Sequence, residues 1–133
     1  MPQLSEIRGD HVLQIDYAAQ AAGASETPVG VVPFNAKVTR VQWVPGAAVT
    51  ANGTNYTTLN LRNRAAGVGS AVAASRSYAA TNSSAQVPED LTLSGTASDL
   101  LLAKGDVLSI DKTIAGTGLA TPAGKVVVYL QAR

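Results

Sequence analysis

The residues that could carry acid–base or metal chemistry in this chain are nine carboxylates and one histidine, and cysteine is absent. The carboxylates are Glu6, Asp10, Asp16, Glu26, Glu89, Asp90, Asp99, Asp106 and Asp111. Glycoside hydrolysis needs two carboxylates held across a cleft, and nothing in this spacing selects a pair. A calcium loop needs acidic residues at alternating positions, and no such run occurs. We therefore predict no metal site among the acidic residues.

The single histidine, His11, and the missing cysteines exclude further classes of site. Paired-histidine and thiolate zinc sites need residues that the chain lacks. The sequence contains no Gly-Xaa-Ser-Xaa-Gly nucleophile elbow and no glycine-rich phosphate loop. We interpret His11 as a polar residue at the start of a strand rather than a general base. The sequence thus predicts a protein that is not an enzyme and that holds no cofactor or metal.

Trp43 is the one tryptophan, and it lies beside Val41 and Val44. An exposed tryptophan could offer a platform on which a sugar ring stacks. A carbohydrate-binding surface usually presents several aromatic side chains, and aromatic residues make up only 5% of this chain. We therefore predict that Trp43 is a core anchor packed between two sheets.

The charge and hydropathy of the chain exclude two classes of partner. Ten basic and nine acidic residues give a net charge of +1, which predicts no nucleic-acid binding. The apolar runs are as short as Val126–Leu130, whereas a membrane-spanning helix needs about 20 residues. The start, Met-Pro-Gln-Leu-Ser-Glu, has no basic stretch followed by an apolar one. We expect no membrane segment and no signal peptide, and hence synthesis in a cytoplasm.

Alternating apolar and polar residues predict strands along most of the chain. The expected strands are His11–Tyr17, Val29–Phe34, Lys37–Val44, Thr57–Arg64, a short pair at Leu91 and Leu93, Asp106–Thr113 and Lys125–Gln131. Pro33 favours an edge strand or a strand end. The alternation shifts between Val38 and Val41, which indicates a bulge or two buried faces.

Glycine, proline and asparagine mark the expected turns and loops. Asn52-Gly53 predicts a type I′ hairpin turn, because both residues tolerate positive φ. Lys104-Gly105-Asp106 and Pro122-Ala123-Gly124 are further turn candidates. We expect Ala18–Pro28 to lie outside strands, Gly67–Ser84 to form one strand with a long loop, and Glu89-Asp90 to form a turn.

The number and spacing of these segments predict the fold class. Seven to nine strands at spacings of 8–15 residues favour an all-β protein, a single antiparallel β-sandwich that is jelly-roll-like. The sandwich should span residues 11–133, after an extended N-terminal arm at residues 1–10. An immunoglobulin-like strand order remains open, because the sequence does not reveal which strands are neighbours.

Four segments occur in an order that is found in a known group of proteins. They are Lys37–Gly46, Tyr56–Asn63, Leu101–Ile110 with its Lys-Gly-Asp turn, and Gly124–Leu130. This order resembles that of the small β-sandwich proteins of tailed-bacteriophage virions. Within that group the chain is most similar to head decoration proteins, also called capsid-stabilising or cement proteins. These are similar in length, low in charge, rich in Ala, Gly and Thr, and free of cysteine.

The resemblance implies a structural virion protein that binds the outside of a phage capsid and stabilises the shell across capsomer seams. Its partner would be the major capsid protein, and it would form a homotrimer on the capsid exterior after synthesis in the host cytoplasm. Met1–Asp10 would be an arm that contacts the capsid, with Leu4 and Ile7 as apolar anchors and Arg8 as a charged contact. A disordered tail is the alternative for this segment.

A second function remains open on the same residues. The chain could be a phage tail-fibre, receptor-binding or carbohydrate-binding β-sandwich module. Trp43 and Tyr56 exposed on one face would favour this alternative.

Overall fold

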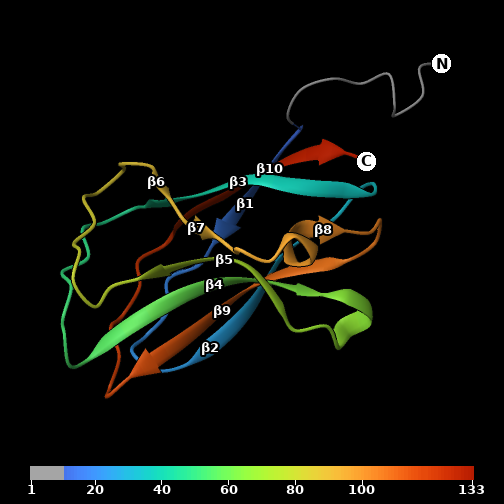
Figure 1. The fold of residues 1–133 in the computed structure, drawn as a ribbon. Coiled ribbons are helices and arrows are strands. Elements are labelled where there is room, and N and C mark those ends of the chain that lie inside the picture. The colour runs from blue at the N-terminus through green and yellow to red at the C-terminus, as the bar shows by residue number, and fades with distance from the viewer. Residues whose placement is uncertain (1–10) are drawn as a thin grey trace.

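The computed structural model describes residues 11–133, which form two antiparallel sheets packed face to face (Figure 1). The strands are β1 His11–Tyr17, β2 Ser25–Val31, β3 Ala36–Pro45, β4 Tyr56–Arg64, β5 Ala71–Ser77, β6 Glu89–Asp90, β7 Thr92–Leu93, β8 Leu101–Leu102, β9 Val107–Ala115 and β10 Gly124–Ala132. Two short 3-10 turns complete the described part, η2 Ala65–Gly67 and η3 Ala97–Leu100. Seven strands have seven residues or more and three have two residues.

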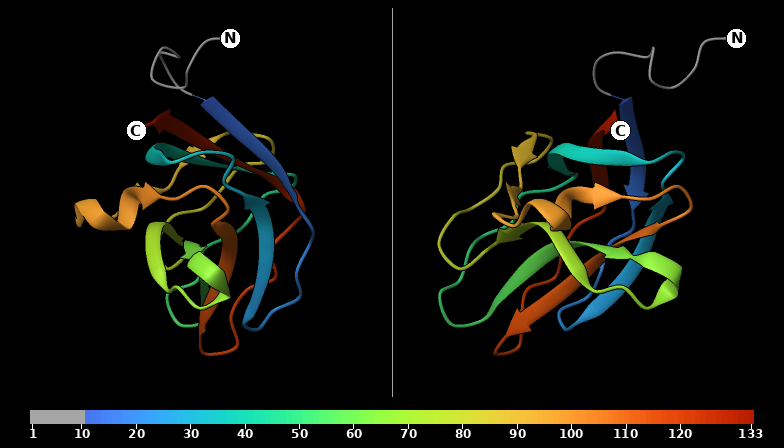
Figure 2. Two further views of the ribbon diagram at one scale, coloured as in Figure 1. Left: turned by 90° about the vertical axis from the view of Figure 1, so that its right-hand side faces the viewer. Right: turned by 45° about the vertical axis from the view of Figure 1, so that its right-hand side comes forward.

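The strand order is that of a jelly roll. Sheet I has the order β1-β10-β3-β6, with β8 also paired to β3, and sheet II has the order β2-β9-β4-β5-β7. The pairs β1·β10, β2·β9, β3·β8 and β4·β5 are nested, as in one long antiparallel hairpin. Rolling this hairpin brings β10 beside β3 and β9 beside β4, so that successive strands alternate between the sheets except for β4 and β5, which are both in sheet II (Figure 2). The expected all-β, jelly-roll-like sandwich is confirmed.

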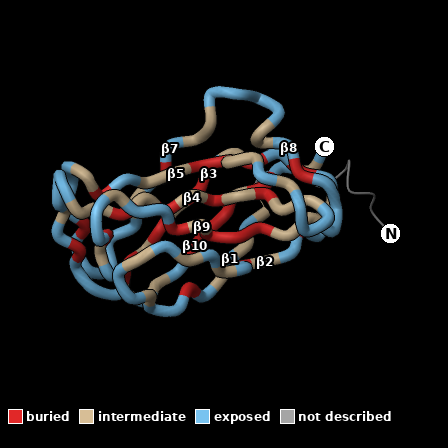
Figure 3. Tube along the Cα trace, turned by 90° about the horizontal axis from the view of Figure 1, so that it is seen from below, coloured by how far each residue is buried: buried red, intermediate tan, exposed pale blue. Residues whose placement is uncertain are grey.

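The core lies between the sheets and follows the period-2 pattern of the long strands. In β4, Leu59 and Leu61 are buried, as their alternation predicts. In β3, Val38 and Val41 are both buried although they are three positions apart, an odd spacing that would put them on opposite faces of a regular strand. The register between β3 and β10 shifts at this point, so Thr39 is the extra residue of a bulge. Figure 3 shows the buried parts of β3, β4, β9 and β10 at the centre of the molecule.

Two segments that we expected to lie outside strands form strands at the edges of the sheets. Ser25–Val31 forms β2, which overlaps the predicted loop Ala18–Pro28, and the strand ends before Pro33. β2 is the edge of sheet II, where Pro28 has no neighbour on its outer side and where the register shifts. Glu89-Asp90, expected as a turn, is β6 and pairs with β3.

The chain crosses from one sheet to the other at Leu91. The expected strand around Leu91 and Leu93 is two pieces, since β6 belongs to sheet I and β7 pairs with β5 in sheet II. Leu91 itself is buried between them. The alternation of the two leucines is therefore real, but the segment joins the layers instead of extending one of them.

The predicted hairpin at Asn52-Gly53 does not form. β3 and β4 belong to different sheets, so their connection crosses the end of the sandwich. The Asn52 side-chain oxygen accepts hydrogen bonds from the backbone N–H groups of Thr54 (2.9 Å) and Asn55 (2.7 Å), which is an Asx turn. Similarly, Gly124 is the first residue of β10 rather than part of a turn.

The predicted Lys104-Gly105-Asp106 turn is present between β8 and β9. Gly105 has a φ of 89°, which favours glycine. The Asp106 carboxylate accepts hydrogen bonds from the Ala103 backbone N–H and from the Asn63 side chain, both at 2.9 Å. The turn is thus held by the aspartate on its own side and by β4.

Gly124 should be intolerant of any side chain. A Cβ atom there would lie 2.7 Å from Cη2 of Trp43 and would also meet the Val44 carbonyl oxygen, which belongs to the backbone and cannot rotate away. We expect Gly124→Ala to lower the free energy of unfolding by roughly 1–3 kcal/mol, measured by urea denaturation. Gly95→Ala is the matched control, because that position is exposed with no atom within 4 Å. Equal stability of the two variants would show that Gly124 of β10 is not packed closely against the Trp43 ring.

Candidate functional site

Trp43 lies in the centre of the core and is 1% exposed. Its ring meets the ring of Tyr17 edge to face, with centroids 5.4 Å apart. Its indole Nε1–H donates a hydrogen bond of 2.9 Å to the Tyr78 hydroxyl. Trp43 therefore offers no surface on which a sugar could stack, and Tyr56 is only half-buried at the start of β4.

Tyr78 links this core contact to the loop after β5. Its hydroxyl also accepts a hydrogen bond of 2.8 Å from Ser83, and burial raises its pKa above the usual range. The Arg76 guanidinium lies over the Tyr78 ring, 4.0 Å from the centroid, and its Nε bonds Glu89 of β6 at 2.8 Å. Trp43 and Tyr78 are 35 residues apart, so nothing in the local sequence pattern predicted this network.

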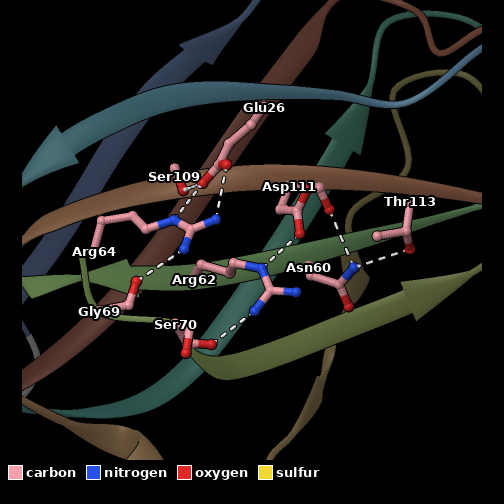
Figure 4. Close-up of polar contacts among 9 residues, drawn as sticks. All are labelled: Glu26, Asn60, Arg62, Arg64, Gly69, Ser70, Ser109, Asp111 and Thr113. Atoms are coloured by element: carbon pink, nitrogen blue, oxygen red, sulfur yellow. Dashed lines mark hydrogen bonds and ion pairs between the residues drawn. The ribbon is translucent and has the colours of Figure 1, made fainter. Parts of the chain in front are cut away.

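The outer face of sheet II carries a ladder of polar side chains (Figure 4). Glu26 of β2 accepts two hydrogen bonds from Arg64 of β4, at 2.6 and 2.8 Å. Ser109 of β9, which lies between them, donates to the same carboxylate at 2.7 Å. Further along, Arg62 pairs with Asp111 at 2.5 Å. The ladder joins three neighbouring strands across the sheet.

The same two arginines hold the connection between β4 and β5. Arg62 Nη1 donates to the Ser70 carbonyl at 2.7 Å, and Arg64 Nη1 donates to the Gly69 carbonyl at 3.0 Å. Both arginines therefore bind their own chain, and the loop lies fixed beside the sheet. A shallow groove of about 440 Å³ lies next to it, lined in part by Pro28, Gly67 and Val107.

The ladder controls the ionisation of Glu26. The hydrogen bond from Arg64, with that from Ser109 second, lowers the Glu26 pKa to about 2. The carboxylate is therefore held in its charged form well below its ordinary range. A group in this state suits a structural contact, whereas a general acid or base needs a pKa nearer to the working pH.

The outer face of sheet I also carries side chains that are paired within the molecule. Arg40 of β3 forms two hydrogen bonds with Asp90 of β6, at 2.7 and 3.2 Å, and this contact lowers the Asp90 pKa. The same guanidinium lies 5.7 Å from the centroid of the Tyr129 ring. The Tyr129 hydroxyl donates to Gln42 at 3.0 Å. These contacts order a tyrosine and an arginine on one exposed sheet face.

A second, larger groove lies between β5 and the segment of β6 and β7. It has a volume of about 610 Å³ and is lined by Ser75, Arg76, Ser77, Thr81, Glu89 and Thr92. Four of these six side chains carry hydroxyl groups. Its charged groups are the Arg76–Glu89 pair, which already bind each other.

Lys112 is a buried lysine that our sequence analysis did not single out. It lies on the inner side of β9, is fully buried, and donates from Nζ to the Ala21 carbonyl at 2.6 Å. Burial lowers its pKa. Its place in an alternating strand, two residues after Ile110, was the only available signal that it points inward.

The other residues that the sequence suggested are scattered. Leu4, Ile7 and Arg8 lie outside the described residues. The His11 ring packs edge to face on Phe34 with centroids 5.1 Å apart, and its Nε2 has no hydrogen-bond partner among residues 11–133. Within that range, no group of three or more histidine and acidic side chains is placed to hold a metal ion. No helix of the same range has the length and hydropathy of a membrane span.

Removing the Tyr78 hydroxyl should destabilise the core. Tyr78→Phe leaves the buried Trp43 N–H without an acceptor, so we expect the free energy of unfolding to fall by about 1–3 kcal/mol. Tyr129→Phe removes a hydroxyl that donates to Gln42 on the sheet face. We expect this variant to change the free energy of unfolding by less than about 0.5 kcal/mol. Chemical denaturation of both variants measures the difference. A Tyr78→Phe variant as stable as Tyr129→Phe would refute the role of this hydroxyl.

The stabilising effect of Glu26 should disappear in acid. The folded protein binds this proton only near pH 2, whereas the unfolded chain binds it near 4.5. The contribution of the Glu26 carboxylate to the free energy of unfolding is therefore complete above about pH 4.5 and is lost as the pH falls toward 2. We expect the stability difference between the wild type and Glu26→Gln to shrink over that window, and to stay nearly constant in an Arg64→Met background. An NMR titration that places the Glu26 pKa near 4.5 would contradict this.

Comparison with known proteins gives no match: no protein-family model, no curated protein and no solved structure is significantly similar to this chain.

Proposed function

We propose that this chain is a structural virion protein that binds the outside of a phage capsid and stabilises the shell across capsomer seams. Its partner is the major capsid protein, and its assembled form is a homotrimer on the capsid exterior. The protein acts by burying surface and carries out no reaction. Many weak contacts, repeated over the shell, add up through multivalency.

The observation that carries this proposal is where the four segments of the resemblance lie in the fold. Lys37–Gly46 contains most of β3, and Gly124–Leu130 is most of β10, its neighbour in sheet I. Tyr56–Asn63 is most of β4, and Leu101–Ile110 runs through β8 and its turn into β9, the neighbour of β4 in sheet II. The resemblance therefore concerns the central strand pair of each sheet. Jelly rolls built in this way recur in viral capsid and lectin domains.

The pairing of surface charges also supports a scaffold role. The ion pairs Arg40–Asp90 and Arg62–Asp111 join neighbouring strands of one sheet, and Arg64–Glu26 spans β9 to join β4 to β2. Side chains held in this way keep one arrangement and lose little further entropy when a partner covers them. A surface of this kind suits a protein that must present the same face at every position of a shell.

A receptor-binding or carbohydrate-binding module is the second candidate. The hydroxyl-lined groove between β5 and the β6–β7 segment favours it, because serine and threonine hydroxyls bond sugar hydroxyls readily. The burial of Trp43 and Tyr78 speaks against it, since these rings would otherwise supply the stacking surface. Glycan-array binding that Thr92→Ala and Ser75→Ala weaken would promote this candidate.

The copy number of the chain in purified virions tests the proposal. Quantitative mass spectrometry should find it in a simple ratio to the major capsid protein. A handful of copies per virion would move the protein to a tail or vertex, and its absence from virions would refute the capsid role.

Residues 1–9 should be needed for capsid binding and not for folding. All described strands lie in residues 11–133, so a truncation lacking 1–9 should keep the far-UV circular dichroism and the unfolding midpoint. Cosedimentation with undecorated capsids should be lost. Leu4→Ala and Ile7→Ala should weaken it, whereas Gln3→Ala serves as the control. Full binding by the truncated protein would remove this segment from the mechanism.

A further inference from the structure

β1 presents an open edge of sheet I. Its seven residues, His11–Tyr17, pair with β10 on one side in a continuous register, and none of residues 11–133 pairs with its other side. The strand contains no proline and no bulge. A long, regular edge of this kind has a row of backbone donors and acceptors that another strand can use.

The other sheet edges in residues 11–133 are blocked or short. β2, the edge of sheet II on the same side of the sandwich, contains Pro28 and a register shift between Pro28 and Gly30. On the opposite side, β6, β7 and β8 have two residues each. Prolines, bulges and short strands are the devices by which proteins prevent edge pairing. β1 is the long edge without any of them.

On both faces of sheet I, the side chains of β1 are suited to contact a strand added at its open edge. On the outer face Val12, Gln14 and Asp16 are exposed, with Val12 at 49%. On the inner face Leu13 and Ile15 are only half-buried, although both pack against the core. The Asp16 carboxylate is neutralised by Lys125 of β10 at 2.6 Å. An added strand would complete the cover of the two apolar side chains without meeting an unpaired charge.

We propose that the occupant of this edge is β1 of a second copy of the chain, paired antiparallel about a two-fold axis at Gln14. Leu13 then lies opposite Ile15 of the second copy, and Ile15 opposite its Leu13. On the outer face Val12 lies opposite Asp16, and Gln14 lies opposite Gln14. Inner residues meet inner residues because the pairing preserves the side-chain alternation. Sheet I becomes continuous across the two copies, and this two-fold contact is separate from the three-fold contacts of the proposed homotrimer because each chain has one β1 edge.

The β1 strand is more complementary to a second β1 in this register than in the two adjacent registers, centred on Leu13 and on Ile15. Centred on Gln14, all seven residues of each β1 are engaged, two Leu–Ile pairs form, and the two Asp16 carboxylates lie at opposite ends. Centred on Leu13, only five residues pair and Ile15 meets His11. Centred on Ile15, five residues pair and Asp16 faces Gln14. Apolar pairs and separated like charges favour the first arrangement. This fit argues for a second copy rather than a foreign strand.

Cysteine cross-linking tests the register, because the chain has no cysteine of its own. In the Gln14→Cys variant, the Cβ atoms of the two cysteines lie about 5 Å apart across the axis. Mild oxidation should therefore join their sulfur atoms in a disulfide and give a covalent dimer. Val12→Cys is the matched control on the same face of the same strand. Its two copies would lie four residues apart along the strands, about 14 Å, and should not cross-link. Equal cross-linking of the two variants, or none by Gln14→Cys, would overturn the proposal.

The charge at position 12 tests the same pairing in the uncross-linked, full-length protein. Val12→Asp places a second carboxylate opposite Asp16 and should weaken the dimer about fivefold, whereas Val12→Lys should strengthen it by a similar factor. Val68→Asp, at a position 82% exposed directly after η2, is the control and should change nothing. Sedimentation equilibrium from roughly 10 µM to 1 mM measures the dissociation constants. A monomer throughout, a trimer without a two-fold contact, or the same response to both charges would refute the two-fold edge.

Residues 1–10 are the competing occupant, since they precede β1 directly in the chain. A truncation that lacks residues 1–9 and carries Gln14→Cys should cross-link as the full chain does. If the segment occupied the edge, the full chain would not cross-link and the truncated variant would, and that outcome would overturn the proposal. The result is independent of the capsid role, which the copy number in virions decides.

Discussion

Trp43 holds the two sheets together through contacts with two tyrosines that come from distant parts of the chain. The chain has one tryptophan, four tyrosines and one phenylalanine, and otherwise fills its core with valine, leucine and alanine. Small side chains bury little area each, so a single large ring contributes much of the packing between the layers. Gly124 makes this possible, because β10 passes beside the indole where any side chain would collide with it. The hydroxyl of Tyr78 satisfies the indole N–H and at the same time fixes the loop after β5.

The polar residues continue this organisation on the outside of the molecule. Arg62, Arg64 and Arg76 each bind a carboxylate on another strand and carbonyl groups of a nearby connection. Loops that would otherwise move are therefore attached to the sheets by charged hydrogen bonds, which are stronger than neutral ones. As a result, charged side chains on the outer faces of both sheets are paired within the molecule. These are properties that a shell-binding protein uses, since rigid and repeated surfaces bind with little loss of entropy.

The jelly-roll winding also determines where the molecule is able to associate. Rolling a long hairpin leaves edges at both sides of the sandwich, and on one side these edges are reduced to two-residue strands. On the other side, Pro28 and a bulge protect β2, whereas β1 remains regular. The proposed backbone pairing uses β1, which among the strands of residues 11–133 has the long regular edge and side chains that match their own two-fold image. The outer faces of the sheets remain free for other partners.

The alternation of apolar residues by itself determined the long strands β1, β3, β4, β9 and β10 and the burial of Leu59 and Leu61, and it indicated a bulge or two buried faces between Val38 and Val41. Such features follow from the two-residue period of a strand and need no knowledge of its neighbours. Sheet membership is different, because it depends on pairings between residues far apart in the chain. For this reason the sequence suggested a hairpin at Asn52-Gly53, where the chain crosses between layers, and began the second strand at Val29 instead of Ser25, because Pro28 is acceptable only in an edge strand. The polar contacts belong to the same class: Arg62 and Asp111 lie 49 residues apart, and Glu26 and Ser109 lie 83 apart. Only the tertiary structure brought them together, since their contact requires β2, β9 and β4 to lie side by side.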